Sequence, residues 1–519
     1  MRVRHLLSIV LGTACGMALV SANAGVALAG PSGIGAYTAQ TNAATRRLAV
    51  TERKIPPRLY SYYTVGTKWR TVNANGWTAG YLPGELWMSY SLTGDSLFKS
   101  RAAIRQDALV DLSVTSSQFD IGHRYYYSLA RGYQLTGNSA YKSKALTAAS
   151  MMSRRYNHAV GAIRSRETIP SCEVVIDELM SVELLWWAAD NGGSPALRRM
   201  ARQHTLTAAR DFVRPDGSTY HLVSYDAKTG AVLARETRQG YSNDSTWARG
   251  QAWAIHGFTA GYRETRDPIL LATARKVGDR YLADLPADNV PYWDFKAPGI
   301  PNEPRDSSAA AVAASGLLDL ATLDPLPENR VRYEAAARAI LDSLATPAYR
   351  SSGGNPAILL HGTMNWYSPA TRDVGLSFGD YFYLEALQRL RRMPETGRPI
   401  AVRRIKASTG VPARVLDGSA RTWWSAKGKQ WIRFDLGARK NVNAVRVSQL
   451  YGTSRSAGLS VHVSNDAKHW RFVRAARTSG ETSSGETYAF APVHARYVRL
   501  SFNGTTRGNN LGITEARVY

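Results

Sequence analysis

Residues 136–156 read TGNSAYKSKALTAASMMSRRY, and this stretch indicates the fold class of most of the chain. Its turn, Thr136-Gly137-Asn138, combines a glycine that can end one helix with an asparagine that can cap the next. Apolar residues then recur every three or four positions: Tyr141, Ala145, Ala148, Met152 and Tyr156. That spacing puts them on one buried face, so the stretch predicts a helix packed against a larger core.

Similar turns divide residues 48–393 into successive helical segments. They contain Gly94, Gly137, Gly192, Pro268 and Pro325. They lie roughly 45 to 75 residues apart, which is the spacing of helical hairpins joined by loops of variable length. Such hairpins form an open solenoid or a closed toroid, and the Trp- and Gly-rich insertions between them favour a toroid with a lined cavity. We expect an all-α domain.

The pattern changes after residues 394–401, where Pro394, Gly397 and Pro399 predict a linker. Short segments of residues 402–519 alternate apolar and polar side chains: 431–436, 444–447, 459–463 and 497–502. A period of two indicates β-strands, and strands at this density predict a β-sandwich.

Residues 1–29 have the layout of a secretory signal peptide. Arg2 and Arg4 precede an apolar run, and Ala27-Leu28-Ala29 supplies small residues for cleavage. We therefore expect a secreted, extracellular protein without a transmembrane segment, in which residues 30–47 form a flexible start. Cys172 is the only cysteine outside the leader, so no intrachain disulfide is expected.

The formal net charge of +25 attracts anionic partners in general. Its arginines are scattered at helical spacing, without a zinc-finger, basic-zipper or RNA-binding signature, so nucleic acid is not expected as a partner. A solvated basic surface explains most of this charge, and a field that steers an acidic saccharide is the second interpretation.

Two acids stand beside aromatic or apolar clusters in the helical region. Asp120 precedes a helix with three tyrosines, and Asp177 directly follows an apolar run. One such Asp is usually a helix cap, but a buried carboxyl also has a raised pKa. Two of them favour paired acid/base chemistry. Trp77, flanked by Gly76 and Gly80, is either a sugar platform or a core residue.

The densest polar cluster is residues 239–253, with His221 upstream. Arg249 and Trp253 are one helical turn apart, so a guanidinium and an indole could face one ligand. A planar fork that grips a carboxylate beside a ring that covers a sugar face suits an acidic sugar. Each also has a structural interpretation: an ion pair for Arg249, the core for Trp253 and a loop hydrogen bond for His221.

These residues resemble the unsaturated glucuronyl hydrolases, glycoside hydrolase family 88. The match covers most of residues 70–390 in order: Asp120-Ile121-Gly122, Ile176-Asp177, residues 239–253, residues 290–295, residues 305–310 and Gly379-Asp380-Tyr381-Phe382. The resemblance implies an (α/α)6 barrel that needs no metal or organic cofactor. Its substrate is an acidic oligosaccharide whose terminal uronate has a C4=C5 double bond left by a polysaccharide lyase.

The resemblance also implies residue roles. Asp177 is the general acid/base, and Asp120 is its essential carboxylate partner. The substrate-contacting positions are Trp77, His221, Gln239, Arg249 and Trp253. Two departures from the family pattern are Phe119, where His is frequent, and Arg166, where Trp is frequent. A cation in place of a stacking ring makes Arg166 a candidate contact for a sulfated or otherwise acidic neighbouring sugar.

Residues 402–519 resemble the discoidin or coagulation-factor type C domains, also seen as carbohydrate-binding module family 32. The match rests on Leu416-Asp417-Gly418, Thr422-Trp423-Trp424-Ser425 and the end of the chain. It implies a polysaccharide-binding domain in which Asp417 and Glu515 are candidate ligands of a structural Ca²⁺, because hard oxygen ligands suit that ion.

Three alternatives stay open from the sequence. Unsaturated rhamnogalacturonyl hydrolases share the barrel and the paired acids but act on pectin fragments. A polysaccharide lyase would centre on a Tyr or His base, and no motif is arranged in that way. A saccharide-binding protein without catalysis would not need both Asp120 and Asp177.

Overall fold

The computed structural model describes residues 34–115, 117, 120–167, 171–393 and 398–519. The expected leader, Phe119 and residues 394–397 of the expected linker lie outside the described residues. Within the described residues, no helix combines the length and the apolar character that a membrane span requires.

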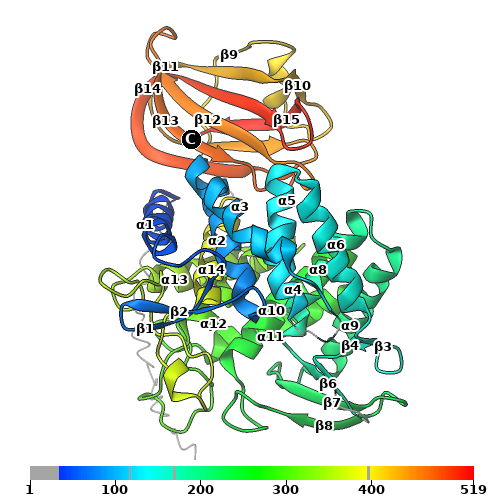
Figure 1. Cartoon of the computed structure of the whole chain (residues 1–519). Coiled ribbons are helices and arrows are strands. Elements are labelled where there is room, and N and C mark those ends of the chain that lie inside the picture. Colours follow the sequence, from blue (N-terminus) through cyan, green and yellow to red (C-terminus); the bar gives the residue numbers. More distant parts are fainter. Residues whose placement is uncertain (1–33, 116, 118–119, 168–170, 394–397) are drawn as a thin grey trace, which may run out of the picture. The chain divides into compact units, whose positions relative to one another are not determined.

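The helical region contains several long helices (Figure 1), and the inner ones are buried on nearly all sides. They are α2 (Tyr81–Thr93), α4 (Ile121–Tyr125) continuing through the π-helical η2 (Tyr126–Ala130) into α5 (Arg131–Thr136), α7 (Glu178–Ser181) with α8 (Glu183–Asp190), α10 (Ala248–Thr265), α12 (Ser307–Leu323) and α14 (Ser377–Leu390). In α12, every residue from Ser307 to Ala321 is buried. A helix without a polar face needs cover on every side, so these helices form a central layer.

The outer helices bury only one face. They are α1 (Ile34–Glu52), α3 (Ser96–Asp111), α6 (Ser139–Ser153), α9 (Pro195–Asp211), α11 (Pro268–Asp284) and α13 (Pro327–Leu344). In α6 the buried residues include Tyr141, Ala145, Ala148 and Met152, so this predicted stripe is confirmed. Tyr156, its predicted last member, lies instead in the short strand β3 (Tyr156–Asn157).

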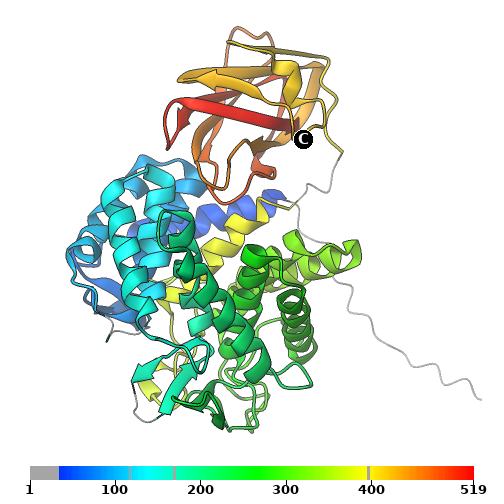
Figure 2. The same ribbon diagram turned by 90° about the vertical axis from the view of Figure 1, so that its right-hand side faces the viewer.

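The inner helices form a closed ring. Each contacts the next, from α2 through α4–α5, α7–α8, α10, α12 and α14, and α14 contacts α2 again. Figure 2 shows the helices of this region packed side by side. Six inner and six outer helical segments therefore make the expected (α/α)6 barrel, and the toroid is confirmed over the solenoid.

The turns work as the sequence indicates. Gly94 and Gly137 have φ values of 72° and 73° at the ends of α2 and α5, a region where other residues are strained. The side chains of Asp95 and Asn138 then accept the backbone N–H of Leu97 and Ala140, which caps α3 and α6.

The expected flexible segment 30–47 is not what the structure has in its described part. Helix α1 spans Ile34–Glu52 and buries Tyr37, Ala44 and Leu48 in the barrel core. These residues are seven and four positions apart, so they share one helical face. The helical region therefore begins before residue 48. The sequence did not predict this helix, because the few apolar residues of its buried face stand among small and polar residues.

A four-stranded sheet interrupts the helices, which the sequence interpretation missed. It consists of β5 (Arg166–Glu167), β6 (Ser171–Val175), β7 (Leu222–Asp226) and β8 (Val232–Glu236), and Figure 1 shows the last three side by side. Two small antiparallel pairs are also present: β1 (Tyr60–Val65) with β2 (Lys68–Val72), and β3 with β4 (Ala162–Ile163). Two-residue and five-residue strands carry too little alternation to be predicted.

The C-terminal strands form the expected β-sandwich. They are β9 (Arg404–Ala407), β10 (Trp424–Lys427), β11 (Lys429–Gln449), β12 (Ala457–Ser464), β13 (Arg471–Arg477), β14 (Glu486–Thr505) and β15 (Asn510–Val518). Segments 431–436 and 444–447, expected as two strands, are both parts of β11. The register between β11 and β14 shifts twice between Asp435 and Ala444. On either side of these shifts β11 pairs with β9 and with β15, so one bent strand serves both layers.

The remaining short helices are η1 (Trp77–Gly80), η3 (Pro369–Thr371) and η4 (Pro412–Val415).

Candidate active site

The four-stranded sheet brings Asp177 and His221 together. Val175, at the end of β6, pairs with Leu222, at the start of β7. The residues just beyond this pair therefore lie at the same end of the sheet, and the Ile176 N–H donates to the His221 carbonyl at 2.9 Å. His221 Nε2 lies 3.7 Å from Asp177 Oδ2.

Asp120 reaches the same place through two closely packed helices. Asp120 and Asp177 occupy the N-cap positions of α4 and α7, and neither side chain caps its own helix. The two helices meet at Gly122, where an added Cβ would lie 2.2 Å from the Ser181 Cα. Because only glycine allows this approach, the spacing of Asp120-Ile121-Gly122 sets the site.

Burial shifts the acids of the site toward their protonated forms. It raises the pKa of Asp177 to about 6, and Arg249 opposes that rise. It raises the pKa of Asp120 well above its usual range, and the charges of Glu178 and Asp177 add to this. The pKa of Glu178 rises to about 7, mainly through burial. Oδ2 of Asp177 is shielded from solvent and has no hydrogen-bond partner among the described residues, although His221 Nε2 lies 3.7 Å from it.

His221 is held neutral with a defined tautomer. Burial, together with the charges of Arg249, Arg238 and Arg166, lowers its pKa to about 3. The Arg238 backbone N–H donates to His221 Nδ1 at 3.0 Å. Nδ1 is therefore an acceptor, and the ring proton sits on Nε2, which faces Asp177.

Arg249 does not face an open cavity, in contrast to the expected grip on a ligand carboxylate. It is 3% exposed, and its Nη1 donates to Asp306 Oδ2 at 2.5 Å and to the Thr363 carbonyl at 2.6 Å. Its Nη2 donates to Gln239 Oε1 at 3.1 Å and to the Met364 carbonyl. All four terminal N–H groups are thus taken, so Arg249 acts on the site by its charge and by holding its neighbours.

The two predicted tryptophans differ in exposure. Trp253 is 1% exposed, so its ring has no open face for a sugar. Its side chain instead acts on Asp177, whose pKa it helps to lower. Trp77 is half-buried and meets Tyr81 and His123 edge to face, with ring centroids 6.0 and 5.8 Å apart. Of the two rings, only Trp77 keeps a surface that a sugar could reach.

Gln239 and Arg166 lie at the margin of the site. Gln239 is half-buried, and its Oε1 is fixed by Arg249. Arg166 is exposed on β5, opposite Glu173 of β6, and its charge reaches His221. Arg166 is therefore the predicted residue best placed to meet solvent or an incoming group.

Sequence reasoning missed several residues of this site. They are Tyr81, His123, Glu178, Trp247 and Asp306. Tyr81 Oη and His123 Nδ1 are 2.5 Å apart. Burial lowers the pKa of His123 to about 4, and the backbone of Asp177 partly opposes this. Glu178 directly follows Asp177, and Trp247 and Asp306 lie within segments 239–253 and 305–310, so the sequence did point to these three residues. The contact of Tyr81 had no such signal.

The fit of Asp417 and Glu515 to a calcium ion is partial. The charge of Asp417 acts on Glu515, and the backbone of Gly418 and Ser419 faces the Glu515 carboxylate. However, Glu515 Oε2 lies 2.9 Å from Arg517 Nη2, and Asp417 accepts hydrogen bonds from Ser419 and Thr422. No group of three or more His, Cys, Asp or Glu side chains suited to a metal occurs in the described part of the chain.

Known proteins resemble both regions. Residues 401–516 match the family model of the F5/8 type C domain. The chain is 38% identical over 330 residues to the unsaturated glucuronyl hydrolase of Formosa agariphila, covering 62% of this chain and 82% of that protein. It is 34% identical to the unsaturated chondroitin disaccharide hydrolase of Streptococcus pyogenes serotype M1, covering 60% of this chain and 80% of that protein.

Solved structures agree. A heparin-specific unsaturated glucuronyl hydrolase matches with a TM-score of 0.64 and 34% identity, over 68% of this chain and 96% of that one. The unsaturated glucuronyl hydrolase of Bacillus sp. GL1, described as responsible for glycosaminoglycan degradation, matches with a TM-score of 0.62 and 30% identity, over 70% of this chain and all of that one.

The relatives of the (α/α)6 barrel place the chain among the glycoside hydrolases. The C-terminal sandwich is an F5/8 type C domain. The chain belongs to the unsaturated glucuronyl hydrolase family.

Proposed function

We propose that the protein releases a terminal 4,5-unsaturated glucuronate from lyase-generated oligosaccharides, with Asp177 as proton donor and acceptor. The observation that carries this proposal is a carboxyl with a pKa of about 6 whose Oδ2 is left without a partner. A general acid works best when its pKa lies near the working pH.

The proposed reaction hydrates the vinyl ether. Protonated Asp177 gives its proton to C4, and positive charge develops at C5 and the ring oxygen. Water adds to C5 and returns a proton to the Asp177 carboxylate. The resulting C5 hemiketal opens to a ketone, and the ring oxygen becomes a hydroxyl on C1. That C1 hemiacetal then collapses to an aldehyde and releases the neighbouring sugar, so one water is consumed.

Asp120 and His221 assist in different ways. The raised pKa of Asp120 keeps this acid protonated, so it can donate a hydrogen bond without placing a second negative charge beside Asp177. His221 points its Nε2–H at Asp177 and stabilises the carboxylate that forms after proton donation. Arg249 supports the same charge state from within the protein.

The substrate class follows from charge and from relatives. Arg166 and Arg238 place positive charge beside the buried His221. Relatives are named for glucuronyl and chondroitin disaccharide substrates, which favours glycosaminoglycan fragments over pectin fragments. We further propose that the F5/8 type C domain binds polysaccharide, since Trp423 and Tyr451 are exposed aromatic residues of that domain.

Cofactor use and location remain part of this proposal. Side-chain acid/base chemistry requires no metal, so we propose that chelation leaves the rate unchanged. Calcium at Asp417 and Glu515 would act only on the stability of the C-terminal domain. The layout of residues 1–29 supports export, and lyases that cut extracellular polysaccharides would supply the substrate there.

One spectroscopic assay separates the candidate functions. The conjugated C4=C5 bond absorbs in the ultraviolet, and hydration destroys it. We expect absorbance to fall when the full chain is given unsaturated chondroitin or heparin disaccharides, with or without a chelator. A rise on intact polymer would mean a lyase, and a fall confined to pectin fragments would mean a rhamnogalacturonyl hydrolase. Binding without any change would mean a saccharide-binding protein.

A further inference from the structure

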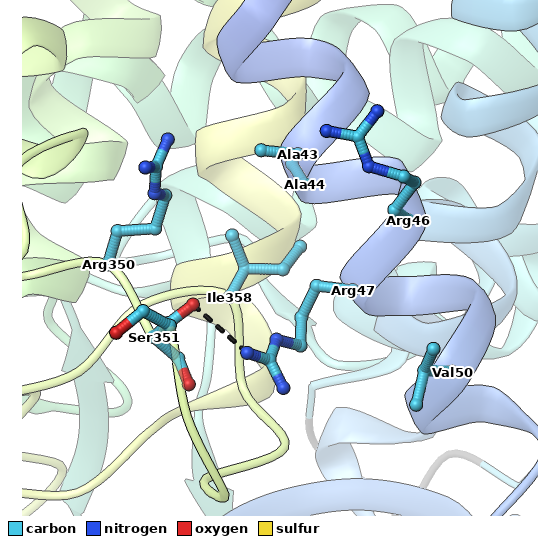
Figure 3. Close-up of a pocket in the computed structure, with 9 residues that line it drawn as sticks. Ala43, Ala44, Arg46, Arg47, Val50, Arg350, Ser351 and Ile358 are labelled. Atoms are coloured by element: carbon cyan, nitrogen blue, oxygen red, sulfur yellow. Dashed lines mark hydrogen bonds between the residues drawn. The ribbon is translucent and has the colours of Figure 1, made fainter.

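A pocket of about 330 Å³ lies on the outer side of the barrel, between α1 and residues 350–358 (Figure 3). Ala43, Ala44 and Ile358 form an apolar floor, and Arg46 and Arg350 stand on either side of it. None of these residues belongs to the site around Asp120 and Asp177. The volume is near the lower end of the range for small-molecule sites, roughly 300–1,000 Å³.

The two walls of the pocket are tied together. Arg47 of α1 donates to the Gly353 carbonyl at 2.9 Å and to the Ser351 carbonyl at 3.1 Å. The second of these bonds is visible in Figure 3. Because Arg47 holds residues 351–353 against α1, the pocket is formed before any ligand arrives.

Arg46 and Arg350, the other two arginines of the pocket, have guanidinium N–H groups that could bind a ligand. Neither the Arg46 nor the Arg350 guanidinium forms a hydrogen bond or ion pair with any described residue. The nearby acids are occupied: Asp342 binds Tyr37 and Gln40, and Asp380 accepts the backbone N–H groups of Ile358 and Leu359. The pocket therefore has an excess of positive charge.

We propose that this pocket is a second saccharide site, in which Arg46 and Arg350 bind the oxyanions of one unit of an acidic oligosaccharide. A guanidinium fork matches sulfate and carboxylate geometry, and the apolar floor suits the C–H face of a sugar ring. The choice of an acidic sugar over other oxyanions rests on the proposed function. Such a site would hold the polymer near the enzyme without taking part in chemistry.

The test uses the full chain and saturated chondroitin sulfate hexasaccharide, which has no C4=C5 bond and is not consumed. Calorimetry would compare the wild type with Arg46→Ala/Arg350→Ala. We expect one binding component to weaken about tenfold, since two charge-assisted contacts are lost, while binding by the F5/8 type C domain stays unchanged. Ala43→Glu places a negative charge on the floor of the pocket. Because this charge repels the acidic saccharide, the substitution should weaken binding at least as much. Lys99→Ala/Arg199→Ala, which removes two exposed cations from α3 and α9, is the matched control.

Activity on an unsaturated disaccharide should be the same for all these variants. The disaccharide assay tests the proposed reaction and the calorimetry tests the pocket, so each proposal can fail without the other. Equal hexasaccharide affinities for wild type and Arg46→Ala/Arg350→Ala would overturn the proposal. Loss of inorganic phosphate binding without loss of hexasaccharide binding would also overturn it, because the pocket would then be a site for free oxyanions.

Discussion

Buried carboxylates occupy both halves of the inner helices, but their surroundings are opposite. At the N-terminal ends, Asp177 has an Oδ2 without a hydrogen-bond partner among the described residues and a pKa raised to about 6 by burial. In the C-terminal half of α14, burial also raises the pKa of Glu385, but Arg389, His256 and Arg131 outweigh it and bring that pKa below its usual range. Glu385 lies 3.0 Å from His256 Nε2 and 3.3 Å from Arg131 Nη2.

The comparison shows that burial alone does not mark a catalytic acid. A carboxylate that gains charged partners stays ionised and joins helices, whereas one that lacks them exchanges a proton near neutral pH. Asp319 of α12 behaves like Glu385, since Arg389 and Arg263 overcome the effect of burial on its pKa. The charged partners of each acid, and not its burial, therefore separate Asp177 from Glu385 and Asp319.

The largest effect is expected for Asp177→Asn. An amide can neither give nor retrieve the proton, so kcat/KM should fall by about 10²–10⁴-fold with the fold intact. The measurement is the loss of ultraviolet absorbance of an unsaturated disaccharide, with circular dichroism as the control for folding. Asp120→Asn should also lower the rate severely. A rate near that of the wild type for Asp177→Asn would remove this residue from the mechanism.

Glu385→Gln should affect stability and spare chemistry. It leaves Arg131, His256 and Arg389 without their shared counter-charge, and breaking a buried pair typically costs about 3–5 kcal/mol. Denaturant unfolding would measure the loss. Asp190→Asn, which removes the exposed pair with Arg198, is the control and should cost under about 1 kcal/mol. A Glu385→Gln protein that folds normally but loses kcat would contradict the division into two halves.

Asp177→Asn should have the opposite effect on stability. The pKa of Asp177 is raised in the folded state, so folding favours the protonated form, and stability is lost as pH rises from about 4 through 6. Removing the charge should stabilise the protein by about 2–3 kcal/mol at pH 8, because folding raises the pKa of Asp177 from 3.8 to about 6. The gain should shrink to under about 1 kcal/mol near pH 4. Unfolding curves at both pH values give the sign, and a loss of stability at pH 8 would show that Asp177 is compensated as Glu385 is.

The smallest effect is expected for Arg166→Ala. Arg166 is exposed, and exposed ion pairs contribute about 0.2–1 kcal/mol, so kcat/KM on a sulfated disaccharide should fall by up to about fivefold. The unsulfated disaccharide is the comparison substrate and should react at the same rate with both proteins. High salt should erase the difference. If wild type and Arg166→Ala react at the same rate on the sulfated disaccharide as well as on the unsulfated one, Arg166 has no part in aglycone recognition.

Local residue patterns were enough to predict several features. The three- and four-residue spacing of Tyr141, Ala145 and Met152 predicted helical packing, and two-residue alternation predicted the sandwich. Asp120 and Asp177 stood out because each follows or precedes an apolar or aromatic run, and the structure places both at N-caps where neither caps a helix. These features depend on residues that are close together in the sequence, so they can be recognised without the tertiary structure.

Only the tertiary structure decided what those residues face. Arg249 looked suited to a ligand carboxylate, but its partners are Asp306 and the Thr363 carbonyl, which are 57 and 114 positions away. The sheet that joins Asp177 to His221 pairs β6, which ends at Val175, with β7, which begins at Leu222, and α14 closes the ring on α2. Periodicity reports which face of an element is buried, and it carries no information about the distant group that buries it. For that reason the sequence by itself determined the two acids and most of the helices and sandwich strands, and the packing decided that burial outweighs the charged neighbours at Asp177 and that the charged neighbours outweigh burial at Glu385.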